Sequence, residues 1–467
     1  MRSDLIFFIL VAIVIGIGYA VSKRPRHFLL AFALISIPWQ GGVWMSFLMV
    51  DIRLVYILII LIIIHIHLFG TKLKKNDRIY GPIFYPALAI IIWALLSTFI
   101  KAYNINYGLK GVFFFTMNLA LFYCVINTIK TPEDVEFILK WYLIGLLFQS
   151  TVAVLQFTNI IFKVPILGEE RAGEMYWRKS GTFIHPNQCG MYHMIMMPLA
   201  LRMAISQVFR KDWKKFALYS FIFVVGILGI FSTFNRGSWI GLAFGIMVMF
   251  GYNLFRTKNK RLKRVLMAMS VAGAIVVAVF LAKYGETLTE RLFESDVEGI
   301  KEGRYELQDA SYDIIKANLI FGVAPWNYQF HMTTVIFVHN LYLLITAENG
   351  IIGLAFFVWF LVMYLREILR GMKSKFIFIS NISSGLFGSL MGFLLSSYPG
   401  PDYFTSHAVG LNIWALAGIA VVLTRMDRKI KFAMKKKKAG EIRQLGQADI
   451  NRNTIIQKNI NMNIQNL

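Results

Sequence analysis

The sequence predicts an all-α protein, a polytopic helical bundle of about 12–13 membrane spans with one large extracytoplasmic loop. Three observations support this prediction. The 467-residue chain is 57% hydrophobic with a mean hydropathy of +0.59, which is more apolar surface than a soluble protein of this size can bury. Apolar runs of about 18 or more residues, long enough to cross a bilayer as helices, recur along the chain. Basic residues cluster in the short intervals between those runs, as is typical of cytoplasmic loops.

The apolar runs divide the chain into five parts. We place the N-terminal spans in residues 1–158, the central spans with a short outer loop in 159–283, and the C-terminal spans in 340–423. The large loop, 284–339, is rich in acidic residues. The remainder, 424–467, is basic and then rich in Asn and Gln, a composition that favours a disordered tail.

The charges predict an orientation in the membrane. Basic intervals such as 207–215 and 256–264 are expected in the cytoplasm, and the intervals 159–185 and 284–339 outside it. This places the N-terminus outside and the C-terminus inside. The basic intervals account for the net charge of +24, so we expect membrane lipids as partners and no nucleic acid.

Several enzyme classes are excluded by motif. The chain contains no P-loop, no G-x-S-x-G and no H-E-x-x-H, which argues against P-loop ATPases, α/β-hydrolases and zinc peptidases. It also lacks an Asp-x-Asp pair, the metal site expected of an enzyme that uses nucleotide sugars. Because soluble nucleotides are absent outside the cytoplasm, a donor used there must carry its own leaving group. A lipid pyrophosphate meets that requirement.

Two arginines are candidates for binding a pyrophosphate, since a guanidinium stays charged and donates to two phosphate oxygens at once. Arg236 lies in a short break between two apolar runs. An arginine within a bilayer costs roughly 2.5–3.5 kcal/mol, so Arg236 is either functional or a boundary arginine that reaches the interface. Arg304 opens a helical pattern and is either functional or a solvated charge on that helix. The apolar positions of the pattern are Leu307, Ala310, Ile314 and Ala317.

His339 is the candidate general base, because it begins an apolar run on the expected outer side and an imidazole titrates near neutrality. The alternative is a structural histidine at the interface. A metal set is also conceivable, composed of His185, His193, His331, His407 and Asp402. None of these residues has metal-ligand spacing, so we predict no metal site and no cofactor.

Short motifs follow one another along the second half of the chain. They are Gly181-Thr182-Phe183-Ile184-His185-Pro186-Asn187, Asn235-Arg236-Gly237-Ser238-Trp239, Gly303-Arg304, Gly322-Val323, His339-Asn340-Leu341-Tyr342 and Glu348-Asn349-Gly350-Ile351-Ile352-Gly353. In this order they resemble the O-antigen ligase and O-antigen polymerase family of bacterial envelope glycosyltransferases, from about Gly181 to Phe360. The resemblance implies that His339 is the catalytic base. It also implies that Arg236 and Arg304 hold a lipid pyrophosphate, with Arg178 in the same basic cluster.

The chain departs from the family pattern at two places. The residue before Arg236 is usually Ser and is Asn235 here. A His-Pro pair often precedes the glycines of the loop, where this chain has Asn318-Leu319. These differences bear on the shape of the loop and leave the three main residues in place.

The resemblance implies a metal-independent, inverting glycosyltransferase in the bacterial cytoplasmic (inner) membrane, with its active site on the extracytoplasmic side. Its donor would be a glycan on polyprenyl (undecaprenyl) pyrophosphate. Its acceptor would be a lipid-linked glycan, lipid A core or a protein, and no motif chooses among them. A transporter or flippase of lipid-linked oligosaccharides is the alternative. A structural scaffold for envelope assembly is a third possibility.

Overall fold

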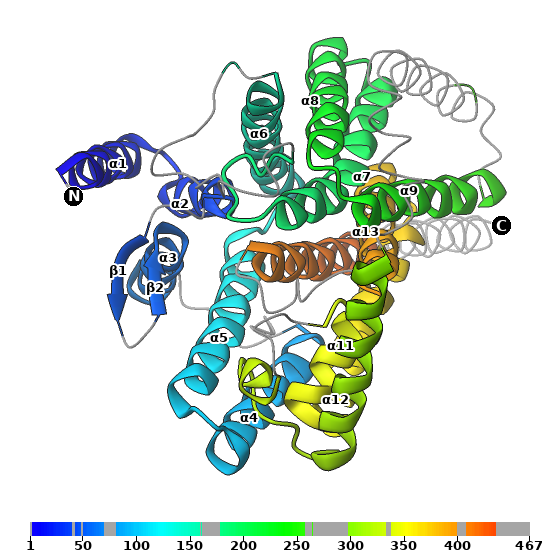
Figure 1. Ribbon diagram of the computed structural model, residues 1–467. Helices are drawn as coiled ribbons and strands as arrows, with labels where there is room; N and C mark the ends of the chain where they lie inside the picture. The colour runs from blue at the N-terminus through cyan, green and yellow to red at the C-terminus, as the bar shows by residue number, and fades with distance from the viewer. Residues whose placement is uncertain are drawn as a thin grey trace, which may run out of the picture.

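A computed structural model describes residues 2–39, 43–47, 50–69, 81–158, 160, 178–256, 264, 298–332, 338–398 and 408–435. Almost all of these residues are helical (Figure 1), which confirms the all-α prediction. The long helices before the large loop are α1 (Arg2–Val21), α2 (Pro25–Ser36), α3 (Leu54–Phe69), α4 (Phe84–Lys101), α5 (Ile105–Thr128), α6 (Pro132–Phe157), α7 (Pro186–Arg210), α8 (Trp213–Ser232) and α9 (Arg236–Arg256). Those after it are α11 (Glu298–Ala317), the 3-10 helix η1 (Tyr328–His331), α12 (Leu341–Met372), α13 (Ile377–Ser396) and a final helix, Ala408–Lys435.

One short hairpin interrupts the helices near the N-terminus. Strand β1 (Val43–Phe47) pairs antiparallel with β2 (Val50–Arg53), and Val43 lies opposite Arg53. The hairpin falls in the interval between the second and third apolar runs, and it fills that connection without changing the fold class.

Seven helices among the described residues are long and apolar enough to cross a membrane, which makes the chain a multi-pass membrane protein. They are α4, α5, α6, α8, α12, α13 and the final helix. Two predicted spans, α7 and α9, are long but less apolar. In α7 nearly every residue is buried among other helices, so its polar side chains meet protein instead of lipid. The predicted span at 265–284 lies outside the described residues.

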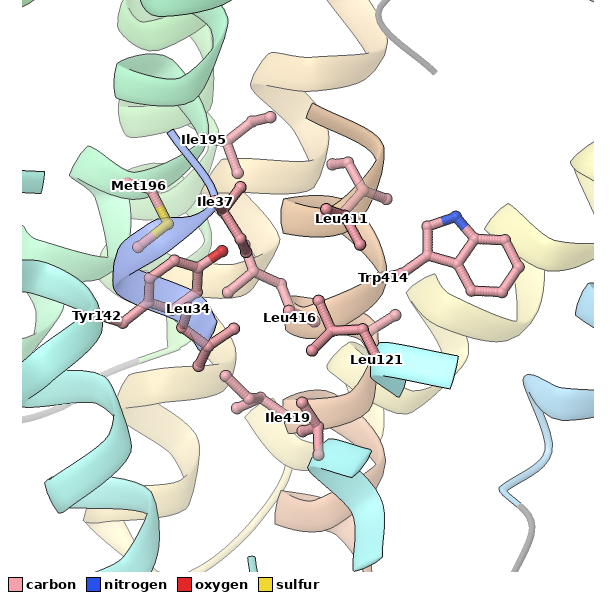
Figure 2. Close-up of a cluster of buried hydrophobic side chains, with 14 of the residues drawn as sticks. Leu34, Ile37, Leu121, Tyr142, Ile195, Met196, Leu411, Trp414, Leu416 and Ile419 are labelled. Carbon is pink, nitrogen blue, oxygen red and sulfur yellow. The ribbon is translucent and has the colours of Figure 1, made fainter. Parts of the chain in front are cut away.

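The final helix occupies the centre of the bundle. Of its most apolar stretch 94% is buried, compared with 33% for α4. In Figure 2 its side chains Leu411, Trp414, Leu416 and Ile419 converge with residues from α2, α5, α6 and α7. Trp414 stacks on Phe360 of α12 at 4.7 Å between ring centroids. A helix surrounded in this way holds the N-terminal and C-terminal halves together.

Helices α9 and α13 cross at glycines. A Cβ added at Gly241 would lie 2.9 Å from the carbonyl oxygen of Gly392, and one at Gly245 would overlap the carbonyl oxygen of Gly388. The two backbones are therefore almost in contact, as at small-residue crossings of membrane helices. This contact fixes α9 against α13.

The structure breaks α12 at Gly350, which has φ 66° and ψ −176°, a conformation available only to glycine. The break frees backbone groups on both sides, and the turn at 319–323 bonds to them. Ile351 N–H donates to Leu319 O at 2.8 Å, and Val323 N–H donates to Ala347 O at 2.9 Å. The loop and the first turns of α12 therefore form one hydrogen-bonded unit.

Helices α4 and α5 hold the far side of this unit. Trp93 Nε1 donates to Asn349 O at 2.7 Å, and the Trp93 ring stacks on Phe321 at 4.9 Å. Ser97 Oγ donates to Phe321 O at 2.8 Å. The side chain of Asn327 accepts from the backbone N–H of Asn104 at 2.7 Å, between α4 and α5. We call residues 319–331 together with 341–349 the outer ledge.

Candidate active site

The first part of the site is the segment 178–187, which leads into α7. Two glutamines of α6 hold this segment by its backbone. Gln149 Nε2 donates to Ser180 O at 3.1 Å, and Gln149 Oε1 accepts from Thr182 N–H at 3.1 Å. Gln156 pairs with both backbone groups of Gly181, at 2.8 Å to its N–H and 3.1 Å to its carbonyl oxygen. Polar side chains in a span are costly unless paired, and these two are paired with the loop.

Glycine is required at position 181. Its φ is +61°, and a Cβ there would overlap the side-chain amide of Gln149. The Gly181-Thr182-Phe183 motif therefore fits a loop that turns sharply under the end of α6, where Thr182 and Phe183 are fully buried.

Arg178 binds the turn between α8 and α9. Its side chain is 8% exposed. Its Nε donates to Thr233 O at 3.0 Å, and Nη2 donates to Asn187 Oδ1 at the start of α7. Lys179 N–H donates to Ser232 O at 3.0 Å in the same contact. Arg178 thus joins three elements, namely its own segment, α7 and the α8–α9 turn.

That turn presents Arg236. Phe234 takes a positive φ of 49°, which reverses the chain. Asn235 then caps α9, because its Oδ1 accepts from Ser238 N–H at 3.3 Å while its Nδ2 donates to Asn187 O at 3.2 Å. Asn and Ser are both good helix N-caps, so the departure at position 235 preserves the helix start. Arg236 is the first residue of α9 and is half-buried.

His339 lies where α12 begins beside the end of α13. Asn340 caps α12, accepting from Tyr342 N–H at 2.9 Å and Leu343 N–H at 3.1 Å. Leu341 N–H donates to Ser397 O at 3.0 Å, and Tyr342 Oη donates to Leu394 O at 2.9 Å. The backbone that follows His339 is therefore fixed, and the imidazole itself is half-buried.

The end of α13 connects the two halves of the site. Ser396 packs on Gly241, with 3.0 Å between its Cβ and a Cβ added there, and its Oγ donates to Met191 Sδ at 3.2 Å. Gly241 lies about one and a half turns after Arg236 in α9. The start of α9, the start of α7 and the start of α12 thus meet around one end of α13. The structure brings Arg178, Arg236 and His339 to the same end of the bundle.

Arg304 lies in α11, which confirms the helix that the sequence predicts there, although α11 begins at Glu298. The side chain of Arg304 lies outside the described part of the molecule. One turn later, Leu307 O accepts from Tyr328 Oη at 3.4 Å. Farther along α11, Ile314 packs in a cluster with Val338, the neighbour of His339. These contacts place α11 against the outer ledge.

The outer ledge has one buried carboxylate. Glu348 is 1% exposed and accepts from Trp326 N–H at 3.0 Å through Oε1. Burial raises the pKa of the Tyr328 phenol above its ordinary value, its hydrogen bond with Ser311 lowers it, and the charge of Glu348 raises it further. Sequence reasoning missed the roles of Glu348, Gln149 and Gln156. Their signal was a polar side chain within an apolar run.

Among the described residues, the histidines of the conceivable metal set do not gather into a ligand group. His193 lies in the core, where Nε2 bonds with Ser150 Oγ at 2.9 Å and Nδ1 with Cys189 O at 2.8 Å. His331 belongs to η1, and His185 caps α7 by accepting from Asn187 N–H at 3.1 Å. Asp402 and His407 lie outside the described residues. Within those residues, no three His, Cys, Asp or Glu side chains are grouped to hold a metal ion.

Comparison with known protein families supports the same region. Residues 221–358 match the family model for O-antigen ligase. The match runs from α8 into α12 and includes Arg236, Arg304 and His339. It confirms the family that the motifs suggested, and it supports a membrane glycosyltransferase of the O-antigen ligase type. No curated protein matches the chain.

Proposed function

We propose that this chain, which carries an O-antigen ligase domain at residues 221–358, transfers a glycan from a polyprenyl pyrophosphate to an acceptor hydroxyl at the extracytoplasmic face of the bacterial inner membrane. The observation that carries the proposal is that the start of α9, with Arg236, and the start of α12, just after His339, lie at the same end of α13. A cation at a helix start and a half-buried imidazole suit a reaction in which an anionic group leaves and a proton is removed.

The proposed reaction is a single displacement. The acceptor oxygen forms a bond to the anomeric carbon while the bond from that carbon to the pyrophosphate oxygen breaks. His339 takes the acceptor proton, and the polyprenyl pyrophosphate leaves with the bonding electrons. Attack opposite the leaving group inverts the anomeric centre, and the arginines supply the positive charge that a metal ion would otherwise provide.

The two arginines of the family match have the same proposed role. Arg236 and Arg304 bind the pyrophosphate and stabilise its growing charge. Arg236 adds to its own charge the positive end of α9, since a helix N-terminus favours an anion. In this proposal Arg304 acts from α11, the helix that packs against the outer ledge.

Arg178 has a different place in the proposal. Its hydrogen bonds to Thr233 and Asn187 support a positioning role, in which it fixes the turn that presents Arg236. Direct contact of Arg178 with the pyrophosphate stays a prediction, because two of its donors already serve the protein.

A purified-enzyme assay tests the proposed base. General-base catalysis contributes about 10²–10⁴-fold, so His339→Ala should lower turnover by that factor and leave donor binding unchanged. His331→Ala is the matched control, since it removes an exposed histidine eight residues earlier. A well-folded His339→Ala enzyme with normal turnover would contradict the proposal and favour the transporter alternative.

The same assay identifies the acceptor class. Lipid-linked glycan, lipid A core and a protein acceptor are offered separately with one lipid-linked donor. Growth of the lipid-linked glycan would identify a polymerase, whereas transfer to core or protein would identify a ligase. Activity in EDTA tests metal independence, because loss of turnover that a divalent ion restores would require a metal site.

A further inference from the structure

A cavity of about 420 Å³ lies between α1 and α3, far along the chain from the residues of the active site. It falls in the size range of small-molecule sites, roughly 300–1,000 Å³. Its walls are apolar side chains, among them Ile15, Leu58 and Leu61. Along α3 it extends from Leu54 to Phe69, which is about 22 Å of helix. The shape and lining suit a hydrocarbon chain.

One end of the cavity is polar. Tyr19 Oη and His65 Nδ1 form a hydrogen bond of 2.8 Å, and both side chains line the cavity. Arg26 lies in the first turn of α2, which packs against both α1 and α3. By the distribution of basic residues, this end faces the cytoplasm, because Lys23 and Arg26 follow α1 directly.

The charges at this end are not all neutralised by the protein. Arg24 pairs with Asp134 at 3.1 Å. Lys23 and Arg26 have no carboxylate partner in the part of the chain that the structure describes, where Lys23 is exposed and Arg26 half-buried. Two such cations beside an apolar cavity match a lipid that carries one negative charge at the head of its acyl chains.

Gly16 shows that the cavity has room. A Cβ added at Gly16 meets no atom within 4 Å, although Gly16 lines the cavity. Opposite it, Leu61 and Ile64 of α3 are 40% and 45% exposed. The cavity thus opens sideways, where a bilayer would lie.

We infer that the α1–α3 cavity binds an anionic phospholipid of the cytoplasmic leaflet, with an acyl chain along α3 and the phosphate at Lys23 and Arg26. The polyprenyl tail of the proposed donor is the less suitable occupant. Its pyrophosphate is used at the opposite face, whereas the polar end of this cavity faces the cytoplasm. The exclusion of the polyprenyl tail rests on the proposed function, whereas the cavity and its charges do not.

Photo-crosslinking in nanodiscs tests this site. The probes are phosphatidylglycerol and phosphatidylcholine with the same diazirine-bearing acyl chain, and peptide mass spectrometry locates the labels. Each basic residue near an anionic lipid adds about fivefold to occupancy. The phosphatidylglycerol probe should therefore label residues 11–21 and 54–69 at least about fivefold more than the phosphatidylcholine probe. Equal labelling by both probes would reduce the site to ordinary lipid contact and overturn the inference.

Two sets of variants separate the acyl chain from the headgroup. Gly16→Leu places a side chain in the cavity. Loss of the acyl-chain contacts that this side chain displaces should lower labelling at least about fivefold. Gly251→Leu is the control, because Gly251 is also a helical glycine with no atom within 4 Å of an added Cβ.

Lys23→Gln with Arg26→Gln should make labelling by the two probes equal, and this pair of changes decides the question if Gly16→Leu does not fold. Unchanged labelling in these variants would contradict the site. Displacement of the probe by equimolar polyprenyl phosphate would assign the cavity to the donor instead.

Discussion

Two segments reach the candidate site, and the protein holds them in opposite ways. Segment 178–187 turns its side chains inward, so that Arg178, Thr182 and Phe183 are buried. The outer ledge is held mainly by its backbone, through Leu319, Phe321 and Val323. Some of its side chains face outward, and Leu319 and Ile320 are 52% and 54% exposed.

The two segments therefore have different roles, because segment 178–187 supports its neighbours and the outer ledge presents a surface. A segment whose polar side chains are mostly bonded to protein can fix a neighbouring turn but has few groups left for a ligand. A segment held by its backbone keeps side chains that can contact one. On this basis we expect changes in segment 178–187 to act through stability. The proposed function predicts that changes at Arg236 and His339, which belong to neither segment, act through substrate.

The largest effect is expected at the break in α12. Gly350→Ala would drive a Cβ into the carbonyl oxygen of Ile320 and force alanine into a glycine-only conformation. We expect a loss of more than about 3 kcal/mol of stability, read as loss of monodisperse protein and of the thermal transition. Gly181→Ala should cost less, since its Cβ meets the movable side chain of Gln149. Equal tolerance of both changes would contradict this ranking.

Replacement of Arg178 and of Arg236 tests the comparison further. Arg178→Gln removes charged hydrogen bonds to Thr233 and Asn187 and should cost about 2–3 kcal/mol. Arg236→Gln should cost less than about 1 kcal/mol of stability and instead weaken donor binding. Thermal midpoints and donor-binding isotherms measure the two effects. A stable Arg178→Gln protein with weak donor binding would give Arg178 the ligand-contact role.

A smaller effect is expected for the α6 glutamines. Gln156→Leu leaves the N–H and the carbonyl oxygen of Gly181 without their partner. A neutral hydrogen bond contributes about 0.5–1.5 kcal/mol, and water entering the loop would replace part of the two that are lost. The thermal midpoint should fall, and addition of Arg178→Gln should cost less than the sum of the two changes, because both act on one segment. If the two losses of stability add fully, Gln156 and Arg178 act independently of each other.

The smallest effect concerns pH. Partial desolvation lowers the pKa of His331, whose side chain is largely exposed, below its ordinary value near 6.5. Between those two values the unfolded chain binds more protons than the folded chain, so stability falls as pH falls below about 6.5. His331→Gln should flatten this slope when thermal midpoints are compared at pH 5.5 and 7.5. An unchanged slope would assign the pH dependence to other histidines.

The sequence was sufficient for the architecture. Apolar runs and loop charges predicted the membrane helices, and the spacing from Leu307 to Ala317 predicted α11. Local patterns work there because a helix satisfies its own backbone, whatever surrounds it. The interval at 43–53 was less predictable, since a short hairpin depends on its neighbours.

The site was predictable in its residue types and less so in its contacts. Motif order identified Arg236 and His339, and the structure brings their backbones to one end of α13. The partners of segment 178–187 could not be predicted, because Thr233 and Gln149 lie far from it in sequence. A conformation such as that at Gly350 also depends on a loop that packs against it from about thirty residues earlier.

The crossing of α9 and α13 limits how these two helices can move. The backbones of α9 and α13 touch where Gly241 and Gly245 lie against Gly392 and Gly388, so no side chain separates them. Neither helix can slide or roll along the other without driving a carbonyl oxygen into the opposing chain. We therefore expect the end that carries Arg236 and the end that holds the start of α12 to move as one piece.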